Sequence, residues 1–400
     1  MSAAENSLKN CYSTTKKASP GVIFGIGHPL LDISADVDEE FLNKWELKPN
    51  DMILCDKKRR PLYEELENYQ TKWLPGGASM NAIRSAQWAL KNQGEEAVGS
   101  TFCTGTVGIH DKNAQRMESA ARYAGVDTKY FPVNEEPAFE KYPELDGRVR
   151  SGSMPTGVCG VLLSGNGKNR SLVTNLAAAR IYLPEFLDKI WQSKVQPAQY
   201  FYSPGFFLTT EDDNGIKCLR KLANHCIENN KTFIGNMSAP FLCTVFRQQF
   251  DEFLSYCDVL FGNDYEYLAW AEANPNLVPK EKREDLHFIN QVVANLPKKN
   301  STKPRLAITT RGDKSTIVSQ GNFPESGDCS TKAIEFPIIK LTEEQLVDTN
   351  GAGDAFVAGF LCGLTYDQSI ENCIKNANQV ASSICQMPGC TFPEKSLLKF

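Results

Sequence analysis

The sequence has little of what metal sites and disulfide frameworks require. Its four histidines lie far apart and form no His-x-x-x-His pair. Its 13 cysteines are scattered over 400 residues without a Cys-x-x-Cys motif. We therefore expect neither a zinc site nor a histidine-based catalytic triad, and the cysteine usage indicates a reducing compartment.

The chain also lacks a positive net charge and a long apolar run. Its formal net charge is −5 at pH 7, so no global positive field exists to hold a nucleic acid. No apolar run approaches the roughly 18 residues that span a bilayer. Residues 1–20 are polar and match neither a signal peptide nor a membrane anchor. We expect a flexible, solvated tail over 1–20, no nucleic-acid or membrane partner, and a cytoplasmic protein, with a nuclear pool left open.

The common nucleotide-binding signatures are incomplete. "GIGHPL" has Gly25 and Gly27, but Leu30 stands where a dinucleotide fingerprint needs its third glycine. "GNGKN" resembles a phosphate loop, yet Asn169 replaces the serine or threonine and Leu162 replaces the first glycine. The second segment is therefore interpreted as a hairpin turn.

What the sequence does contain is an α/β pattern. With 41% hydrophobic and 23% charged residues, the composition is that of a globular protein. Residues 211–229 have apolar positions at helical spacing. Five short apolar runs predict buried strands, and strand–helix–strand order favours a parallel sheet with ligands beyond its carboxyl ends. The runs are 21–27, 199–203, 231–235, 258–262 and 305–309.

Two regions interrupt this alternation, roughly 30–76 and 130–175. In the second, "GVCGVLL" and "RSLVT" flank "SGNGKN" and predict a β-hairpin. We expect both regions to build a smaller second domain, with the hairpin in a covering lid.

The stretch "DTNGAGDAFVAGF", Asp348 to Phe360, places small residues and an acid at the start of an apolar helix. Gly351, Ala352 and Gly353 leave backbone N–H groups open at the positive end of that helix, where anions bind. Asp354 is placed to take a proton from a hydroxyl attacking a phosphoryl group. The alternative is a structural acid that compensates the helix dipole, contributing roughly 0.3–1 kcal/mol.

This stretch resembles the C-terminal signature of the PfkB, or ribokinase-like, family of sugar and nucleoside kinases. "LPGGASMNAIRSAQWAL" (74–90) resembles the family's N-terminal Gly-Gly signature. Within the family, seven further segments are similar to the kinases that act on adenosine: "GHPLLDISA", "PTGVC", "NRSLVTNLAAA", "GFFLT", "NMSAPF", "LFGNDYE" and "GCTFPEK". The likeness covers about residues 22 to 396.

The resemblance implies a fold and a domain division. The fold is a three-layer αβα sandwich with a mostly parallel central sheet, plus a small α/β lid domain. The large nucleotide-binding and catalytic domain is expected over 21–29, 77–130 and 176–400, and the lid over 30–76 and 131–175.

The resemblance also implies an activity: ATP, with Mg²⁺, gives its γ-phosphoryl group to the 5′-hydroxyl of adenosine, forming AMP and ADP in a monomeric enzyme. Asp354 matches the family's catalytic base, and the amides of Gly351, Ala352 and Gly353 match its anion hole. Arg170 corresponds to a lid arginine that reaches the transferring phosphate.

Six residues correspond to the acceptor site. Asp32 matches the acid that receives the ribose 2′- and 3′-hydroxyls, and Phe207 matches an aromatic wall for the adenine face. Without the family, Asp32 would be interpreted as a turn cap, and Phe206 and Phe207 as plain core residues. The remaining members are Gly76, Gly77, Asn81 and His28.

Six further residues correspond to the ATP site. Asn263 and Glu266 form the family's Asn-x-x-Glu pattern, which acts on Mg²⁺ and phosphate through water. Arg311 and Gly312 are expected at the ATP phosphates and ribose, and Asn350 and Asn378 near the ATP base and phosphates.

Some features depart from the family pattern. His28 stands where asparagine is expected and Ala78 where a hydroxyl residue is common, which puts substrate choice in question. Residues 134–155 form a longer connection than usual. Two alternatives therefore stay open: another sugar or nucleoside kinase of this fold, and a catalytically silent binding protein.

Overall fold

The structure is a computed structural model that describes residues 8–14, 18–49, 51–93, 97–109, 111–133, 155–165, 169–322, 332–396 and 398. The long connection expected over 134–155 lies outside these residues except for its last position. So does the turn of the expected lid hairpin at 166–168.

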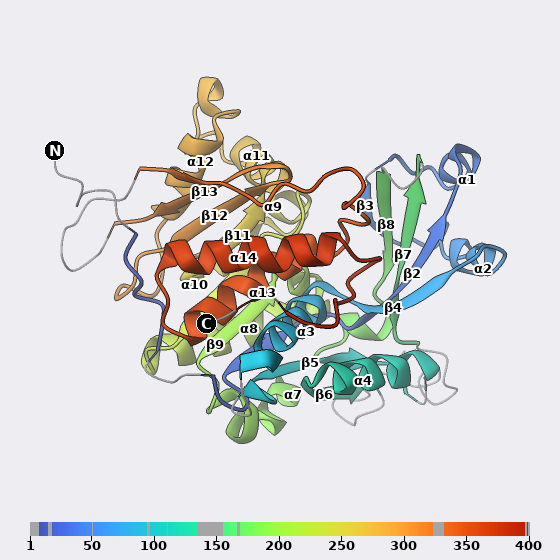
Figure 1. The fold of residues 1–400 in the computed structure, drawn as a ribbon, viewed down its shortest axis with the longest axis horizontal. Coiled ribbons are helices and arrows are strands. Elements are labelled where there is room, and N and C mark those ends of the chain that lie inside the picture. Colours follow the sequence, from blue (N-terminus) through green and yellow to red (C-terminus); the bar gives the residue numbers. More distant parts are fainter. Residues whose placement is uncertain are drawn as a thin grey trace.

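A large sheet forms the centre of the molecule (Figure 1). Its order is β14-β13-β12-β11-β10-β9-β1-β5-β6, and pairing is parallel from β12 to β6. Only β13 and β14 are antiparallel within the described sheet. Its strands are β1 (Ile23–Ile26), β5 (Thr101–Val107), β6 (Asp127–Pro132), β9 (Tyr200–Pro204), β10 (Thr232–Asn236), β11 (Val259–Asn263), β12 (Leu306–Arg311), β13 (Lys314–Gln320) and β14 (Ile334–Phe336).

Helices cover both faces of this sheet, because successive strand residues point to opposite sides. Ile23 of β1 packs in one hydrophobic cluster and Phe24 in the other. One face carries α7 (Pro184–Lys189), α8 (Asn214–Glu228), α9 (Leu242–Val245), α10 (Arg247–Tyr256), α11 (Asp264–Ala273) and α12 (Leu286–Ala294). The other carries α3 (Ala78–Leu90), α4 (Lys112–Ala124), α13 (Ala352–Thr365) and α14 (Ile370–Cys385). The three-layer αβα fold is confirmed.

A second, smaller sheet stands at one end of the molecule (Figure 1). Its order is β3-β8-β7-β2-β4, and α1 (Glu39–Lys44) and α2 (Leu62–Leu66) pack on it through a separate hydrophobic cluster. The expected hairpin is present as β7 and β8, which pair antiparallel. The strands are β2 (Leu30–Asp36), β3 (Met52–Leu54), β4 (Lys72–Gly76), β7 (Gly157–Ser164) and β8 (Asn169–Asn175). We call this sheet and its helices the lid.

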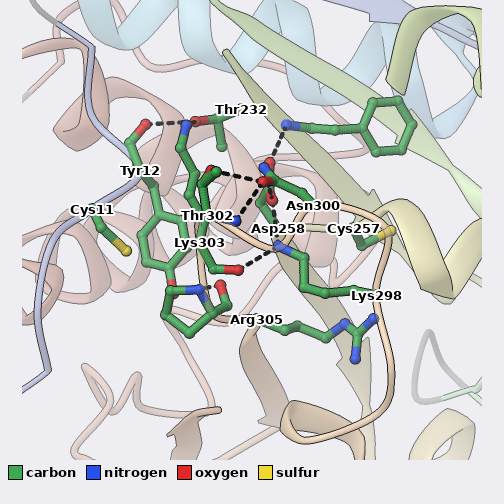
Figure 2. Close-up of polar contacts among 12 residues, drawn as sticks. Cys11, Tyr12, Thr232, Cys257, Asp258, Lys298, Asn300, Thr302, Lys303 and Arg305 are labelled. Carbon is green, nitrogen blue, oxygen red and sulfur yellow. Dashed lines mark hydrogen bonds and ion pairs between the residues drawn. The ribbon is translucent and has the colours of Figure 1, made fainter. Parts of the chain in front are cut away.

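The prediction of a solvated N-terminal tail is wrong for residues 8–14, which dock on the large domain at the amino ends of its strands. Tyr12 is fully buried. Its carbonyl accepts a hydrogen bond from Thr232 Oγ1 at 2.6 Å (Figure 2). Its hydroxyl donates to the carbonyl of Pro304 at 3.2 Å. Gln320 Nε2 in turn donates to the Tyr12 hydroxyl at 2.9 Å. The tail prediction failed because these partners lie more than 200 residues away in the sequence.

Beside Tyr12 lies a buried polar cluster centred on Asp258 (Figure 2). This carboxylate is 1% exposed and accepts hydrogen bonds from the backbone N–H of Phe233, from Lys298 Nζ and from Asn300 Nδ2. Because every oxygen of the buried charge is paired, the cluster fixes the starts of β10 and β11 and the loop before β12.

Among the described helices, none has both the length and the apolar character needed to cross a membrane.

Candidate active site

A cavity of about 220 Å³ lies between the lid and the carboxyl ends of the parallel strands. This is where open α/β sheets bind ligands, because loops leaving adjacent strands diverge there. The lid contributes Leu30, Asp32, Met52, Ile53, Leu54, Cys159, Arg170, Leu172 and Thr174. Of the residues expected in the site, the cavity brings together His28, Asp32, Gly77, Asn81, Arg170, Asn263, Glu266, Asn350, Gly351, Gly353 and Asp354.

The floor of the cavity is the start of α13. Gly351 is the residue before the helix and has a left-handed φ of 77°, which a glycine adopts without strain. Gly351 and Gly353 line the cavity, but Ala352 does not, and its N–H donates to the carbonyl of Thr349 at 3.2 Å. The expected anion hole therefore narrows to the amides around Gly351 and Gly353 at the positive end of the helix.

Asp354 lies in the first turn of α13, half-buried and facing the cavity. Its Oδ2 accepts a hydrogen bond from Asn81 Nδ2 of α3 at 3.1 Å. Removal from water raises the pKa of Asp354 to about 7, and the negative charges of Asp32 and Glu266 act in the same direction, while Asn81 and Arg170 oppose them. A carboxylate poised near neutral pH suits a general base.

Asp32 projects from lid strand β2 and is 6% exposed. Burial raises its pKa to about 7. The strand β4 passes so close that a Cβ on Gly76 would lie 2.1 Å from Asp32 Oδ1, and one on Gly77 would lie 2.2 Å from the carbonyl oxygen of His28. The Gly-Gly pair is thus required because backbone packs directly on the acid and on the chain leaving β1.

Asn350 lines the cavity beside the lid acid. Its Nδ2 donates to Asp32 Oδ2 at 3.4 Å, and its expected role at ATP stays a prediction.

His28 is 4% exposed, and its Nε2 lies 3.2 Å from Thr210 Oγ1. Burial, aided by the charge of Arg180, lowers the pKa of His28 to about 3. The imidazole is therefore neutral at physiological pH and contributes to the cavity wall by hydrogen bonding and packing, not by its charge.

The prediction that Phe207 faces the ligand space is wrong. Phe207 is fully buried in the core, against the rings of His28 and Tyr182, whereas Phe206 lines the cavity. Both belong to a 3₁₀ helix, Gly205–Thr209, in which successive side chains point about 120° apart. Only one of two neighbours can therefore face the ligand space.

Arg170 reaches from lid strand β8 to the loop before α13. Its Nη1 donates to Thr349 Oγ1 at 3.2 Å and lies 3.7 Å from Asp348 Oδ1. The arginine thus links the lid to the loop that precedes α13.

Asn263 and Glu266 form a reciprocal cap at the start of α11. Asn263 donates to Glu266 through its backbone N–H at 2.9 Å and its Nδ2 at 3.0 Å, and Glu266 N–H donates back to Asn263 Oδ1 at 2.9 Å. Burial raises the pKa of Glu266 to about 7.

Asn263 and Glu266 fit a magnesium ion that is held through water rather than by direct ligation. A carboxylate has about four acceptor positions, so Glu266 can still accept from a metal-bound water. Among the described residues, no three His, Cys, Asp or Glu side chains are grouped to hold a metal directly. The donors therefore fit an ion held by phosphates and water, as Mg²⁺ commonly is in nucleotide sites.

Three of the residues expected at ATP do not line this cavity. Arg311 donates from Nε to the carbonyl of Ser315 and pairs with Glu335 at 2.9 Å. Gly312 turns between β12 and β13 with φ 60°. Asn378 Nδ2 donates to the carbonyl of Pro337 at 3.3 Å. Their expected role at ATP stays a prediction.

The sequence reasoning assigned no role to several lining residues, among them Asn236, Ser238 and Phe241. Ser238 has a left-handed φ of 69°, accepts the N–H of Gly205 at 2.9 Å, and so orients the helix that carries Phe206. All three belong to the motif "NMSAPF" (236–241), whose resemblance to the family is the signal in the sequence that points to them.

Comparison with known proteins adds independent findings. A family model described as pfkB family carbohydrate kinase matches residues 144–397. Adenosine kinase 2 of Arabidopsis thaliana is 36% identical over 378 residues, which are 94% of this chain and 96% of that protein. Adenosine kinase of Dictyostelium discoideum is 33% identical, with 92% and 95% covered.

Among solved structures, Anopheles gambiae adenosine kinase in complex with P1,P4-di(adenosine-5) tetraphosphate has a TM-score of 0.80 at 36% identity, covering 94% of this chain and 98% of that one. Schistosoma mansoni adenosine kinase in complex with 2-fluoroadenosine has a TM-score of 0.79 at 28% identity, with the same coverage.

Proposed function

The chain belongs to the pfkB family of carbohydrate kinases, among relatives that are adenosine kinases, and on that premise we propose that it is an ATP-dependent adenosine kinase. It transfers the γ-phosphoryl group of ATP to the 5′-hydroxyl of adenosine and yields AMP and ADP. The observation that carries this proposal is the shared cavity, where the acid Asp354, the helix amides beside it and the lid acid Asp32 face one space.

In this mechanism the lid side of the cavity holds the acceptor. Asp32 accepts the ribose 2′- and 3′-hydroxyls, since two adjacent donors suit a bidentate carboxylate. Phe206 packs on the adenine ring, and the neutral His28 borders the same part of the cavity. The 5′-hydroxyl is thereby directed toward Asp354 at the floor.

The chemical step is a displacement at the γ-phosphorus. The 5′-oxygen forms the new P–O bond, its proton passes to Asp354, and the bond to ADP breaks. The amides around Gly351 and Gly353, together with Arg170, stabilise the charge on the transferring group. Because the pKa of Asp354 is raised to about 7, the carboxylate can take the proton without being permanently neutral.

ATP approaches from the strand ends at β11 and β12. Asn263 and Glu266 are the residues that would hold Mg²⁺ through water, and such an ion would supply positive charge for the phosphates of ATP. Apolar lid residues Met52 and Leu54 line the opposite side of the cavity and would exclude water from the reacting groups.

The test is product formation from a panel of acceptors. Purified protein is given ATP and Mg²⁺ with adenosine, inosine, guanosine, ribose or fructose, and nucleoside monophosphate or sugar phosphate is quantified. We expect AMP formation to exceed every other product and to stop when EDTA removes Mg²⁺. Preference for a sugar or another nucleoside would contradict adenosine as the acceptor but leave phosphoryl transfer from ATP intact. Binding of adenosine without turnover would favour a catalytically silent binding protein.

A further inference from the structure

The segment that follows α14 contains the motif "GCTFPEK", which the proposed mechanism does not use. Residues 389–393 form neither helix nor strand. They nevertheless run between lid strand β4, helix α3 and the loop that leads into α13, and they contact all three. We call residues 389–393 the C-terminal wedge.

The wedge is joined to the anion-hole loop through one carboxylate. Asp348 Oδ2 accepts the N–H of Gly389 at 2.8 Å, and Asp348 Oδ1 accepts the N–H of Asn350 at 2.8 Å. Because the two bonds use the two oxygens of a single side chain, the position of the wedge and the course of the loop are fixed together.

The next residue packs directly against the anion hole. A Cβ built on Gly351 would lie 2.9 Å from Cys390 Cβ and 3.0 Å from Cys390 Sγ, so this side chain fills the space behind the glycine. Cys390 is 2% exposed, and burial raises the pKa of its thiol to about 12. The thiol is therefore neutral and acts by its shape rather than as a nucleophile or base.

On the side opposite Gly351, the wedge packs against α3, which prevents Cys390 from moving away from Gly351. The ring of Phe392 stacks on Trp88 with centroids 5.7 Å apart and lies 5.0 Å from the guanidinium of Arg84. Trp88 Nε1–H donates to the carbonyl of Pro393 at 2.9 Å. Behind the wedge is thus the buried helix α3, whose Asn81 also contacts Asp354.

The wedge also contacts the lid. Gly389 has a left-handed φ of 62°, and a Cβ there would lie 2.4 Å from Leu74 Cδ1 of β4. Arg84 Nη1 donates to the carbonyl of Pro75 at 3.1 Å, directly before the Gly76–Gly77 pair. The wedge therefore contacts both lid strand β4, through Gly389, and Gly351 at the start of α13, through Cys390.

We infer that Cys390 is a positioning residue: held between Phe392 and Asp348, its side chain keeps Gly351 in the left-handed turn that aims the first amides of α13 into the cavity. This inference rests on the proposed function, since those amides act on the transferring phosphoryl group. A displacement of about 1 Å at such a group typically costs ~10²-fold in rate.

The chain supplies a matched control at the other end of the same helix. A Cβ on Gly363 of α13 would lie 2.7 Å from Cys373 Sγ, and Cys373 is fully buried. This is also a buried thiol packed on a glycine of α13, but it projects from α14 and neither residue lines the cavity. Crowding at Cys373 should therefore disturb stability without disturbing catalysis.

The experiment compares Cys390→Val with Cys373→Val in kcat, adenosine Kd and thermal midpoint. We expect Cys390→Val to lower kcat by ~10–100-fold while the adenosine Kd changes by less than ~3-fold. Cys373→Val should keep kcat within ~3-fold of the wild type although its thermal midpoint falls comparably. Equal kcat for the two variants would overturn the inference, as would a loss confined to adenosine binding.

If Cys390→Val does not fold, Cys390→Ala and Cys373→Ala replace the pair, because they remove the sulfur contact without adding bulk. A kcat for Cys390→Ala ~3-fold or more below that of Cys373→Ala supports the inference, and equal values refute it. The wild-type rate with adenosine tests the proposed function separately, since the inference depends only on the ratio of variant rates measured with whichever acceptor the wild type uses.

Discussion

Replacing Asn81 with alanine should move the pH at which the enzyme loses activity in acid. Asn81 Nδ2 donates to Asp354 Oδ2 at 3.1 Å, a bond that favours the ionised carboxylate. Burial already raises the pKa of Asp354 to about 7. Without the amide, the ionised form loses its donor, so the pKa rises further and a larger share of the enzyme is protonated and inactive at neutral pH.

The size of the shift follows from the strength of that bond. A hydrogen bond to a charged group contributes ~1.5–3 kcal/mol net, and ~1.4 kcal/mol corresponds to one pKa unit. Water entering the space left by the amide recovers part of this, so we take the lower end. The acid limb of kcat/KM should therefore move upward by ~1 pH unit.

The assay is kcat/KM for adenosine at saturating ATP and Mg²⁺, from about pH 5.5 to pH 9. Asp32 and Glu266 also have pKa values raised to about 7, so the acid limb of kcat/KM reports the titration of all three carboxyl groups together. The quantity to compare is therefore the shift of this limb between the wild type and the variant. Asn290→Ala is the control, because this asparagine is fully buried on α12 and bonds Thr309, away from the acids. A limb that stays in place or moves downward in Asn81→Ala would refute the reasoning.

Three further outcomes are expected. Phe206→Ala should raise KM for adenosine ~3–10-fold at little cost in stability, whereas Phe207→Ala should lower the free energy of unfolding by ~3–5 kcal/mol; kinetics and urea unfolding would show the reverse if Phe207 were the wall. The pKa of Asp32 is raised to about 7, so its contribution to the stability of the ligand-free protein is present below its unfolded pKa and is lost as pH rises through 7. Urea unfolding between about pH 5 and pH 8 should therefore show a smaller loss for Asp32→Asn than for the wild type, and equal slopes would contradict the assignment. Tyr12→Ala should cost ~3–5 kcal/mol of stability because Tyr12 is fully buried, yet leave kcat unchanged since it lies at the amino ends of the strands, opposite the cavity; a lower kcat in the folded variant would argue against this.

The parallel sheet was predictable where its strands are apolar runs, as in β10 and β11. Strand β5 is not predicted by its sequence, because "TFCTGTV" contains three threonines and is half polar. All three are fully buried, with hydroxyls donating to Gln87 Oε1 and to the carbonyls of Lys129 and Ala179. Such partners come from other elements, so no local pattern reveals them.

The site shows the same division. Asp354 and Asp32 were predictable because each belongs to a motif with a chemical reason for its residue types. The choice between Phe206 and Phe207 was not, since the two are adjacent and only the 3₁₀ helix decides which one faces the cavity. The contact of Cys390 with Gly351 likewise depends on the path of the chain after α14. The local sequence around either residue does not predict that path.

The most direct test of the proposed function is single-turnover AMP formation by Asp354→Asn beside the wild type, with adenosine binding measured on the same samples. The substitution keeps the size of the side chain and the cavity that holds adenosine, but removes the group that takes the proton. We predict a Kd for adenosine within ~3-fold of the wild type and a rate of AMP formation lower by ~10²–10⁴-fold. AMP formation at the wild-type rate would contradict the account.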